Sequence, residues 1–220
     1  MKRVKAASLV LDFDLYPRNN VDAHNVRCII DSLEAGEEMP PVIVCRKSHR
    51  VVDGFHRVKA VLQRDPEGEV EIVEKTYRND SALFLDSMRY NACHGARLDP
   101  CDRTRCTIIA ERLSIPLDAV AGALHMPIGK LGKLHTDRTA KSSNGQAVAL
   151  KRTIKHMNGR RLTKAQGEAN EHLSGMNQAF YANQLIHLLE NDLLDREDEK
   201  LLERLRVLHG LLENVVAAVA

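Results

Sequence analysis

The 220-residue chain contains no tryptophan, and only 4% of its residues are aromatic. Aliphatic side chains must therefore build its core, and they are available because 44% of the residues are hydrophobic. A chain of this length can bury enough apolar surface for one or two domains.

Long hydrophobic runs are absent as well. No apolar segment approaches the ~18 residues that cross a bilayer, and the N-terminus lacks the apolar region of a signal peptide. The sequence therefore predicts a cytoplasmic protein with no membrane partner.

Cysteine spacing excludes the usual cross-linked scaffolds. The five cysteines are odd in number and include no Cys-x-x-Cys pair, so neither a disulfide framework nor a zinc ribbon is expected. Cys93, His94, Cys101 and Cys106 could gather round a metal, but buried free thiols on helices are the preferred interpretation. The chain also lacks clustered carboxylates that would hold two metal ions, so no metal site and no nuclease activity are predicted.

Charge is unevenly distributed along the chain, although the net charge is only +2. Residues 1–96 carry 14 basic and 15 acidic groups, residues 97–164 carry 14 and 5, and residues 165–220 carry 4 and 10. A near-neutral start, a basic middle and an acidic end indicate that the middle binds a polyanion.

Residues 1–96 mix strand and helix signals. Asp22 or Asn20 caps a helix that ends at Gly36. A Pro-Pro pair then leads into a strand that turns back through Arg46–His49. The predicted strands are Ser8–Phe13, Val42–Cys45, Arg50–Asp53 and Glu69–Tyr77, the other predicted helices are His56–Gln63 and Ala82–Ala92, and Lys2–Lys5 is expected to fray.

Residues 97–140 lose the strand pattern and become helical. Asp99 or Asp102 caps the first helix, and a turn around His125–Pro127 separates two shorter ones. This spacing predicts a helix-turn-helix DNA-binding domain; the alternative is a structural three-helix bundle with a solvated basic face. The predicted DNA contacts are Lys130, Lys133, His135, Thr136 and Arg138.

Residues 141–220 are predicted to be a helical C-terminal region. Thr139–Gln146 is interpreted as a polar linker, Ala147–Met157 as a short basic helix, and Thr163 with Gln166 as a capping box. The last two predicted helices are Met176–Leu194 and Glu197–Val216, with leucines at three- and four-residue spacing. They form either the core of a helical hairpin or a surface that joins two copies of the chain.

The stretch Val51–Ala60 is the centre of the sequence. Two β-branched residues, Asp-Gly and a helical apolar pattern indicate a strand, a tight turn and a helix. A glycine permits a positive φ and close approach of another group, and helix N-termini bind phosphate. The sequence therefore predicts an anion site at this turn, with an ordinary β–α turn whose Arg57 pairs with a surface carboxylate as the alternative.

Asp53-Gly-Phe-His-Arg-Val-Lys-Ala60 resembles the phosphate-binding box of the ParB/sulfiredoxin superfamily. The resemblance extends from the segment at Leu15–Arg18 to the signature at Asn91–Leu98, and covers roughly residues 8–138. That signature resembles ParB-like DNA-binding regulators, in which a helix-turn-helix follows the ParB-like domain. The resemblance implies CTP with Mg²⁺ as ligands, and it implies that the nucleotide is bound by Arg18, Gly54, His56, Arg57 and Asn91.

Several residues depart from the family pattern. Phe55 stands where ParB proteins have Glu and where sulfiredoxins have their nucleophilic cysteine, so sulfiredoxin chemistry is not expected. Tyr90 replaces the Glu that precedes Asn91, which removes a hard Mg²⁺ ligand. Nucleotide hydrolysis is therefore not expected, and no catalytic residue is assigned on the main interpretation. Asp53 and His56 also resemble free-serine kinases, so a small-molecule kinase or nucleotidase is the alternative.

Together these patterns predict an α+β protein. It has a mixed α/β ParB/sulfiredoxin-like domain over residues 1–96, an all-α helix-turn-helix domain over 97–140, and a helical tail over 141–220. The predicted function is DNA binding in transcriptional regulation or in plasmid or chromosome partition, gated by a nucleotide. The expected partners are double-stranded DNA and a second copy of the chain.

Overall fold

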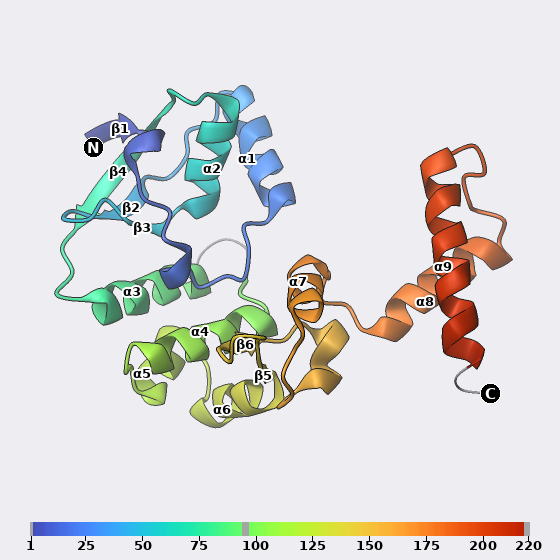
Figure 1. Cartoon of the computed structure of the whole chain (residues 1–220). Coiled ribbons are helices and arrows are strands. Elements are labelled where there is room, and N and C mark those ends of the chain that lie inside the picture. The colour runs from blue at the N-terminus through green and yellow to red at the C-terminus, as the bar shows by residue number, and fades with distance from the viewer. Residues whose placement is uncertain (1, 94–96, 218–220) are drawn as a thin grey trace. The chain divides into compact units, whose positions relative to one another are not determined.

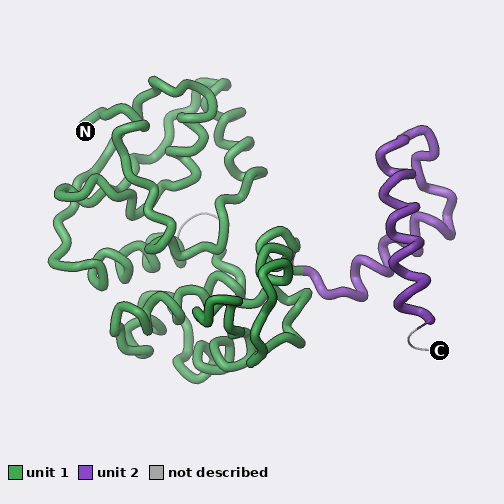
Figure 2. Tube along the Cα trace, viewed as in Figure 1, with its two compact units in different colours: residues 1–175 green, residues 176–220 purple. Residues whose placement is uncertain are grey.

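The computed structural model describes residues 2–93 and 97–217. The chain divides into two compact units, residues 1–175 and residues 176–220 (Figure 2). It belongs to the α+β class, as predicted, with an α/β part followed by helices (Figure 1). The boundary predicted between residues 96 and 97 falls inside the first unit. His94 and Gly95, which belong to the signature at Asn91–Leu98, lie outside the described residues.

The α/β part contains a four-stranded sheet in the order β1–β4–β2–β3. β4 (Glu69–Lys75) lies between β1 (Lys2–Lys5), with which it is antiparallel, and β2 (Val42–Cys45), with which it is parallel. β3 (Val51–Asp53) pairs antiparallel with β2 and completes the predicted hairpin.

The sheet is covered on both faces, because alternate residues of β2 serve different cores. Val42 and Val44 pack in a cluster with α2 (Phe55–Arg64), which in turn packs on α1 (Ala23–Glu34). Cys45 belongs to a second cluster with α3 (Asp80–Cys93). Figure 1 shows α1 and α2 on one side of the strands and α3 on the other. A strand that is buried on both faces reads as a continuous apolar run, and Val42–Cys45 has this pattern.

The helices α4 (Pro100–Arg112), α5 (Leu117–Ala123) and α6 (Ile128–Asp137) share the second core with α3. Val120 of α5 and Leu131 of α6 are fully buried in it. Asp99 and Asp102 both take part in the capping box that starts α4, so both predicted caps are used. This common core explains why the α/β part and α4–α6 form one compact unit.

Two predictions for the N-terminal segment were wrong. Lys2–Lys5 does not fray but forms the edge strand β1, where exposed cations suit an unpaired sheet edge. Ser8–Phe13 is not a strand: it contains one isolated bridge, from Val10 to Arg50, between the 3₁₀ turns η1 (Ala6–Ser8) and η2 (Phe13–Leu15). The carboxylate of Asp12 accepts a hydrogen bond from the Asp14 N–H at 3.0 Å and starts η2, so local side-chain capping outcompetes a strand.

The segment after α6 also differs from the prediction. Thr139–Gln146 is not a linker, and Ala147–Met157 is not one helix. β5 (Thr139–Lys141) and β6 (Ala147–Ala149) form an antiparallel hairpin, followed by the 3₁₀ helix η3 (Arg152–Met157). The Asn-Gly pair in the connection is a hairpin signal, and Gly145 adopts a φ of +88° there.

The C-terminal elements follow the predicted pattern. α7 (Lys164–His172) begins with the expected capping box of Thr163 and Gln166. The second unit contains α8 (Gln178–Glu190) and α9 (Glu199–Ala217), and none of its described residues is buried. Over the part of the chain that the structure describes, no helix is long and apolar enough to cross a membrane.

Candidate functional site

Gly54 forms the turn between β3 and α2, as the central motif predicted. Its φ of +107° lies in the left-handed region, which disfavours any side chain. A Cβ at this position would lie 3.1 Å from both Val42 Cγ2 and Arg57 Nη2. Glycine is therefore favoured here by the positive φ, and a side chain would also crowd Val42 and Arg57. The first N–H groups of α2 have no acceptor within the helix, which creates a site that favours anions.

All five residues predicted to bind nucleotide line one cavity of about 560 Å³. They come from three distant parts of the chain, and the volume lies within the range of small-molecule sites. The predicted residues are joined in the lining by aromatic and apolar side chains of the neighbouring elements. The five are Arg18, Gly54, His56, Arg57 and Asn91.

The guanidinium of Arg57 is held by neighbouring groups of the protein. Nη2 donates to the carboxylate of Asp53 at 2.7 Å, and Nη1 donates to the carbonyl oxygens of Pro40 and, at 2.9 Å, Pro41. Both charged side chains are largely buried, with exposed fractions of 16% and 25%. Arg57 therefore fastens the loop before β2 to the start of α2, and its charge is balanced by Asp53.

His56 links α2 to α1. Its Nε2 accepts a hydrogen bond from the backbone N–H of Asp22 at 3.1 Å, which leaves the ring proton on Nδ1. Burial lowers the pKa of His56 below its ordinary value, and the nearby positive charge of Arg18 adds to this effect. The ring is therefore neutral near pH 7 and positions the start of α1 rather than supplying positive charge to the cavity.

We expect acidification to destabilise the protein through His56. The folded pKa lies below the ordinary value of 6.5, so the unfolded chain takes up the proton first as the pH falls. The stabilising contribution is full above the ordinary pKa and is lost as the pH falls through it toward the folded value. Urea unfolding of His56→Gln from pH 8 to pH 5 should show a weaker pH dependence than the wild type, because glutamine retains an acceptor for Asp22. His24→Gln, which removes an exposed imidazole, is the control; equal pH dependence in all three proteins would contradict the prediction.

Asn91 orients Arg18. Its side-chain oxygen accepts from Arg18 Nε at 3.1 Å, and its Nδ2 donates to the carbonyl of Ser87 at 2.9 Å. Ser87 Oγ in turn donates to the carbonyl of Val52 in β3 at 2.7 Å. The amide is thus fixed to α3 and the sheet, and Arg18 is the cavity cation whose side chain it holds in place.

Tyr16 is a cavity residue to which the motif reading assigned no role. Its ring stacks on Phe55 with centroids 4.0 Å apart and an interplanar angle of 13°. Its hydroxyl is buried, and no group among the described residues hydrogen-bonds to it. Burial raises the pKa of this hydroxyl, so it remains a neutral donor. A buried donor of this kind is costly unless a ligand or water accepts from it.

The donor set fits a phosphate but not a protein-bound Mg²⁺. Arg18 and the start of α2 supply positive charge and N–H groups, and Tyr16 supplies a buried hydroxyl. Asp53 is the one carboxylate in the described lining, and it is paired with Arg57. Within residues 2–93 and 97–217, no three His, Cys, Asp or Glu side chains are grouped to hold a metal ion. Since Mg²⁺ prefers carboxylate oxygens, the cavity suits an anionic ligand without a metal held by the protein.

The five predicted DNA contacts differ in their exposure to solvent. Lys130, Lys133 and Thr136 are exposed along α6. His135 turns inward: Nδ1 lies 2.7 Å from Thr107 Oγ1, and Nε2 lies 3.3 Å from the carboxylate of Glu111. The remaining predicted contact, Arg138, is half-buried at the C-terminal cap of α6. The lysines are therefore the clearest outward-facing part of the predicted set.

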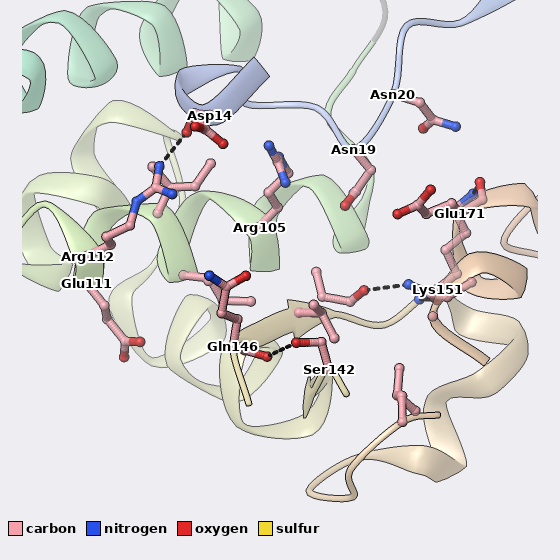
Figure 3. Close-up of a pocket in the computed structure, with 18 residues that line it drawn as sticks. Asp14, Asn19, Asn20, Arg105, Glu111, Arg112, Ser142, Gln146, Lys151 and Glu171 are labelled. Atoms are coloured by element: carbon pink, nitrogen blue, oxygen red, sulfur yellow. Dashed lines mark hydrogen bonds between the residues drawn. The ribbon is translucent and has the colours of Figure 1, made fainter. Parts of the chain in front are cut away.

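The segment 13–19, which carries Tyr16 and Arg18 into the cavity, is held by α4. Arg105 donates to the carbonyls of Tyr16 at 3.1 Å and Phe13 at 2.6 Å. Arg112 Nη2 donates to the carbonyl of Asp14 at 2.7 Å (Figure 3). Asp102 accepts from the backbone and side-chain N–H groups of Asn19 at 2.8 and 3.0 Å. These contacts, between residues more than 80 positions apart, were missed because no local pattern signals them.

Figure 3 shows a second cavity, lined by α4, the β5–β6 hairpin, α7 and the segment 14–20. Its volume is also about 560 Å³. The cations that line it serve the fold: Arg105 and Arg112 hold the segment 13–19, and Lys151 Nζ donates to the carbonyls of Glu171 and Leu173 at the end of α7. These bonds explain the burial of Lys151 without a ligand.

No protein-family model and no curated protein matches this chain. It is similar to the solved structure of the C-terminally truncated chromosome-partitioning protein ParB from Caulobacter crescentus, complexed to the centromeric parS site. The identity is 15% and the TM-score 0.45, over 62% of this chain and 71% of that chain.

Two further solved structures are similar to the chain at 15% identity. One is a pNOB8-like ParB-N domain, with a TM-score of 0.42 over 79% of this chain and 64% of that chain. The other is the truncated Caulobacter crescentus ParB complexed with CTP-gamma-S, with a TM-score of 0.36 over 61% of this chain and 76% of that chain.

Proposed function

We propose that this protein binds double-stranded DNA through a helix-turn-helix formed by α5 and α6, and that it senses a nucleotide in the cavity around Gly54. Its role would be transcriptional regulation or plasmid or chromosome partition. The observation that carries the proposal is the outward-facing pair Lys130 and Lys133 on α6, which follows α5 after a short turn within the most basic part of the chain.

The geometry around α6 is suited to a DNA-reading helix. Leu131 anchors the helix in the shared core, while Lys130 and Lys133, three residues apart, lie on its exposed side. His125 adopts a φ of +49° in the turn before α6, a conformation that glycine often takes there. An exposed basic helix of this kind would place its lysines against phosphates or base edges in the major groove.

The proposed cavity ligand is a phosphate-bearing nucleotide, with CTP as the choice that the motif resemblance implies. Arg18 and the start of α2 would bind its phosphates, and Asn91 would keep Arg18 in position. Position 90 carries tyrosine rather than a carboxylate, and Asp53, the one carboxylate of the described lining, is paired with Arg57. Both features argue against hydrolysis, which needs a group that holds a metal ion or activates water.

Equilibrium binding to random-sequence duplex DNA, measured over a salt series with and without CTP, tests this proposal. A steep loss of affinity with increasing salt is expected, because phosphate contacts release counterions. A change in affinity on adding CTP would link the cavity to DNA binding. An absence of DNA binding at low salt would overturn the proposal.

An assay of nucleotide turnover in the absence of DNA separates the proposal from the enzyme alternative. A kinase or nucleotidase would turn over a nucleotide without DNA, and His56→Ala would abolish this turnover. The structure gives this alternative little support, because Asp53 is paired with Arg57 and His56 accepts a backbone hydrogen bond.

We also propose that residues 176–220 join two copies of the chain. α8 and α9 bury no residue among themselves, and a two-helix unit of this size needs additional burial to be stable. Val207, Leu211 and Val215 follow one another at four-residue spacing on α9 with exposed fractions of 55%, 60% and 59%. A second copy would cover this stripe in a helical bundle.

Leu211→Asp should therefore convert a dimer into a monomer, because a buried carboxylate facing an apolar partner is strongly unfavourable. Sedimentation velocity over a range of protein concentrations measures this change. His209→Asp adds a carboxylate on the opposite side of the same helix, because His209 lies two residues, or about 200°, before Leu211, and its side chain is 76% exposed; this variant should leave the dimer intact. A wild-type monomer at all concentrations, or a dimeric Leu211→Asp variant, would contradict the assignment of this stripe.

A further inference from the structure

A strongly basic surface follows α6 and contains none of the predicted DNA contacts. Residues 139–167 include no aspartate or glutamate and carry seven cations. The cations are Lys141, Lys151, Arg152, Lys155, Arg160, Arg161 and Lys164. Such a run is unexpected for a linker, and the hairpin fold gives it a defined shape.

The segment after η3, residues 158–162, returns to β5 and pairs with it along the edge of the hairpin. The N–H of Lys141 donates to the carbonyl of Arg160 at 2.9 Å, and the N–H of Leu162 donates to the carbonyl of Lys141 at 2.7 Å. Lys141 and Arg161 form an isolated parallel bridge. The hairpin and residues 158–162 therefore lie side by side, and Lys141, Arg160 and Arg161 are gathered at this edge.

The inner side of this edge is packed, which fixes the cations in place. Ala140, Leu150 and Leu162 form a small buried core. The carbonyl of Arg138, at the end of α6, accepts from the N–H of Leu150 at 2.8 Å. The basic edge thus has a defined position relative to the helix that carries Lys130 and Lys133.

The seven cations differ in their partners. Lys155 pairs with Asp137 at 3.5 Å and Lys164 with Glu168 at 3.9 Å, while Lys151 is buried against carbonyls of α7. Arg152 of η3 and the three edge residues Lys141, Arg160 and Arg161 are exposed and have no carboxylate partner among the described residues, and the last three lie together at the edge. Three unbalanced cations on one rigid edge produce a local field that attracts a polyanion.

We propose that Lys141, Arg160 and Arg161 form a second phosphate-binding surface for duplex DNA, beside α6. This inference rests on the proposed function, since it takes DNA as the polyanion. The contact is assigned to the phosphate backbone, which supplies half or more of all protein–DNA hydrogen bonds and carries no sequence information. It adds affinity equally on all sequences and orients α6 on the duplex.

The triple variant Lys141→Gln/Arg160→Gln/Arg161→Gln tests the inference, measured by fluorescence anisotropy on random-sequence duplex DNA from low to high salt. Loss of three phosphate contacts should reduce the slope of log affinity against log salt by roughly 2–3 and weaken binding at least tenfold at low salt. Glutamine preserves much of the aliphatic stem, and circular dichroism with thermal unfolding establishes that the variant is folded. Lys5→Gln/Arg27→Gln/Lys47→Gln removes three exposed cations from the α/β part and should change the slope little.

The outcomes separate the inference from the proposed function. If the wild type binds DNA and the triple variant has the same affinity and slope, the inference is overturned and the α6 assignment stands. An affinity that increases in the triple variant also overturns it, since the edge would then oppose DNA binding rather than add to it. If the wild type shows no DNA binding, the proposed function itself fails.

Discussion

Replacing Lys130 and Lys133 with alanine is expected to weaken binding to duplex DNA by roughly ten- to a hundredfold near 0.1 M salt. Both lysines are exposed on α6 and lie on one side of it. If each contacts one phosphate, the slope of log affinity against log salt should fall by roughly 2. Fluorescence anisotropy over a salt series measures both quantities on one sample.

The fold should tolerate this double substitution. Alanine has a higher helix propensity than lysine, and the anchor of α6 is the buried Leu131. A drop in DNA affinity is therefore attributable to the lost charges. Lys5→Ala/Lys47→Ala removes two exposed cations from the α/β part and is the matched control. Equal affinities of the Lys130→Ala/Lys133→Ala variant and the wild type would show that α6 does not face DNA.

His135 provides an internal contrast. It was predicted to face DNA from the same helix, yet it contacts Thr107 and Glu111 of α4. Charge and spacing alone place residues 130, 133 and 135 in one group, because they are close in sequence. A helix turns by about 100° per residue, so Lys133 and His135 point in widely different directions. The inward direction of His135 depends on the packing of α6 on α4, which no local pattern contains.

The cavity shows what the sequence could predict well. The motif at Asp53–Arg57 required a glycine at the end of β3, and Gly54 has the positive φ that this reading implies. The resemblance grouped Arg18 and Asn91 with this motif although they are 73 residues apart, and the two side chains are hydrogen-bonded. The proximity of these distant residues could be predicted because the family motif already indicates which of them meet.

The charges and hydrogen-bond partners of the cavity residues could not be predicted from the motif. Arg57 has the residue type of a phosphate ligand, but its two terminal nitrogens are bonded to Asp53 and to the loop before β2. His56 has the residue type of a cation, but burial and a backbone hydrogen bond keep it neutral. Residue types give the set of available groups, whereas the partners that neutralise them come from tertiary contacts.

The hairpin after α6 shows a different kind of error. Thr139–Gln146 contains Ser, Asn and Gly, which are common in linkers and in β-turns alike. β5 and β6 have only three residues each, which is too short for an alternating pattern to be recognised. Their stability comes from the buried cluster of Ala140, Leu150 and Leu162, whose members are spread over 23 positions. The basic edge of the proposed second DNA surface exists only because this hairpin forms.

The contacts of α4 with residues 13–19 connect the two proposed sites physically. Tyr16 and Arg18 line the proposed nucleotide cavity, and the same segment is hydrogen-bonded to α4, which packs against α6 in the shared core. A ligand that draws Arg18 or the Tyr16 hydroxyl toward itself therefore acts on a segment held by α4, which packs against the proposed DNA-binding helix α6. Coupling requires that the ligand bind two arrangements of this segment with different affinity.

Arg105→Met should therefore both destabilise the protein and weaken nucleotide binding. The guanidinium of Arg105 donates to the carbonyls of Phe13 and Tyr16, and methionine keeps the stem while removing both bonds. Because bonds from a charged donor contribute more than neutral ones, the free energy of unfolding should fall by roughly 2–4 kcal/mol. Denaturant unfolding measures this loss. CTP affinity, measured where the variant is still folded, should fall as well, because Tyr16 and Arg18 lose their support.

Arg112→Met is the matched control for the hydrogen bonds from Arg105 to segment 13–19. It removes a hydrogen bond to the carbonyl of Asp14 from a more exposed arginine on the same helix. A smaller loss of stability is expected, with CTP affinity close to that of the wild type, because Asp14 does not line the nucleotide cavity. If Arg105→Met lowers stability but leaves CTP affinity intact, the Arg105 hydrogen bonds support the fold without positioning the cavity residues. If neither quantity changes, segment 13–19 is held by its own packing, through the stacking of Tyr16 on Phe55.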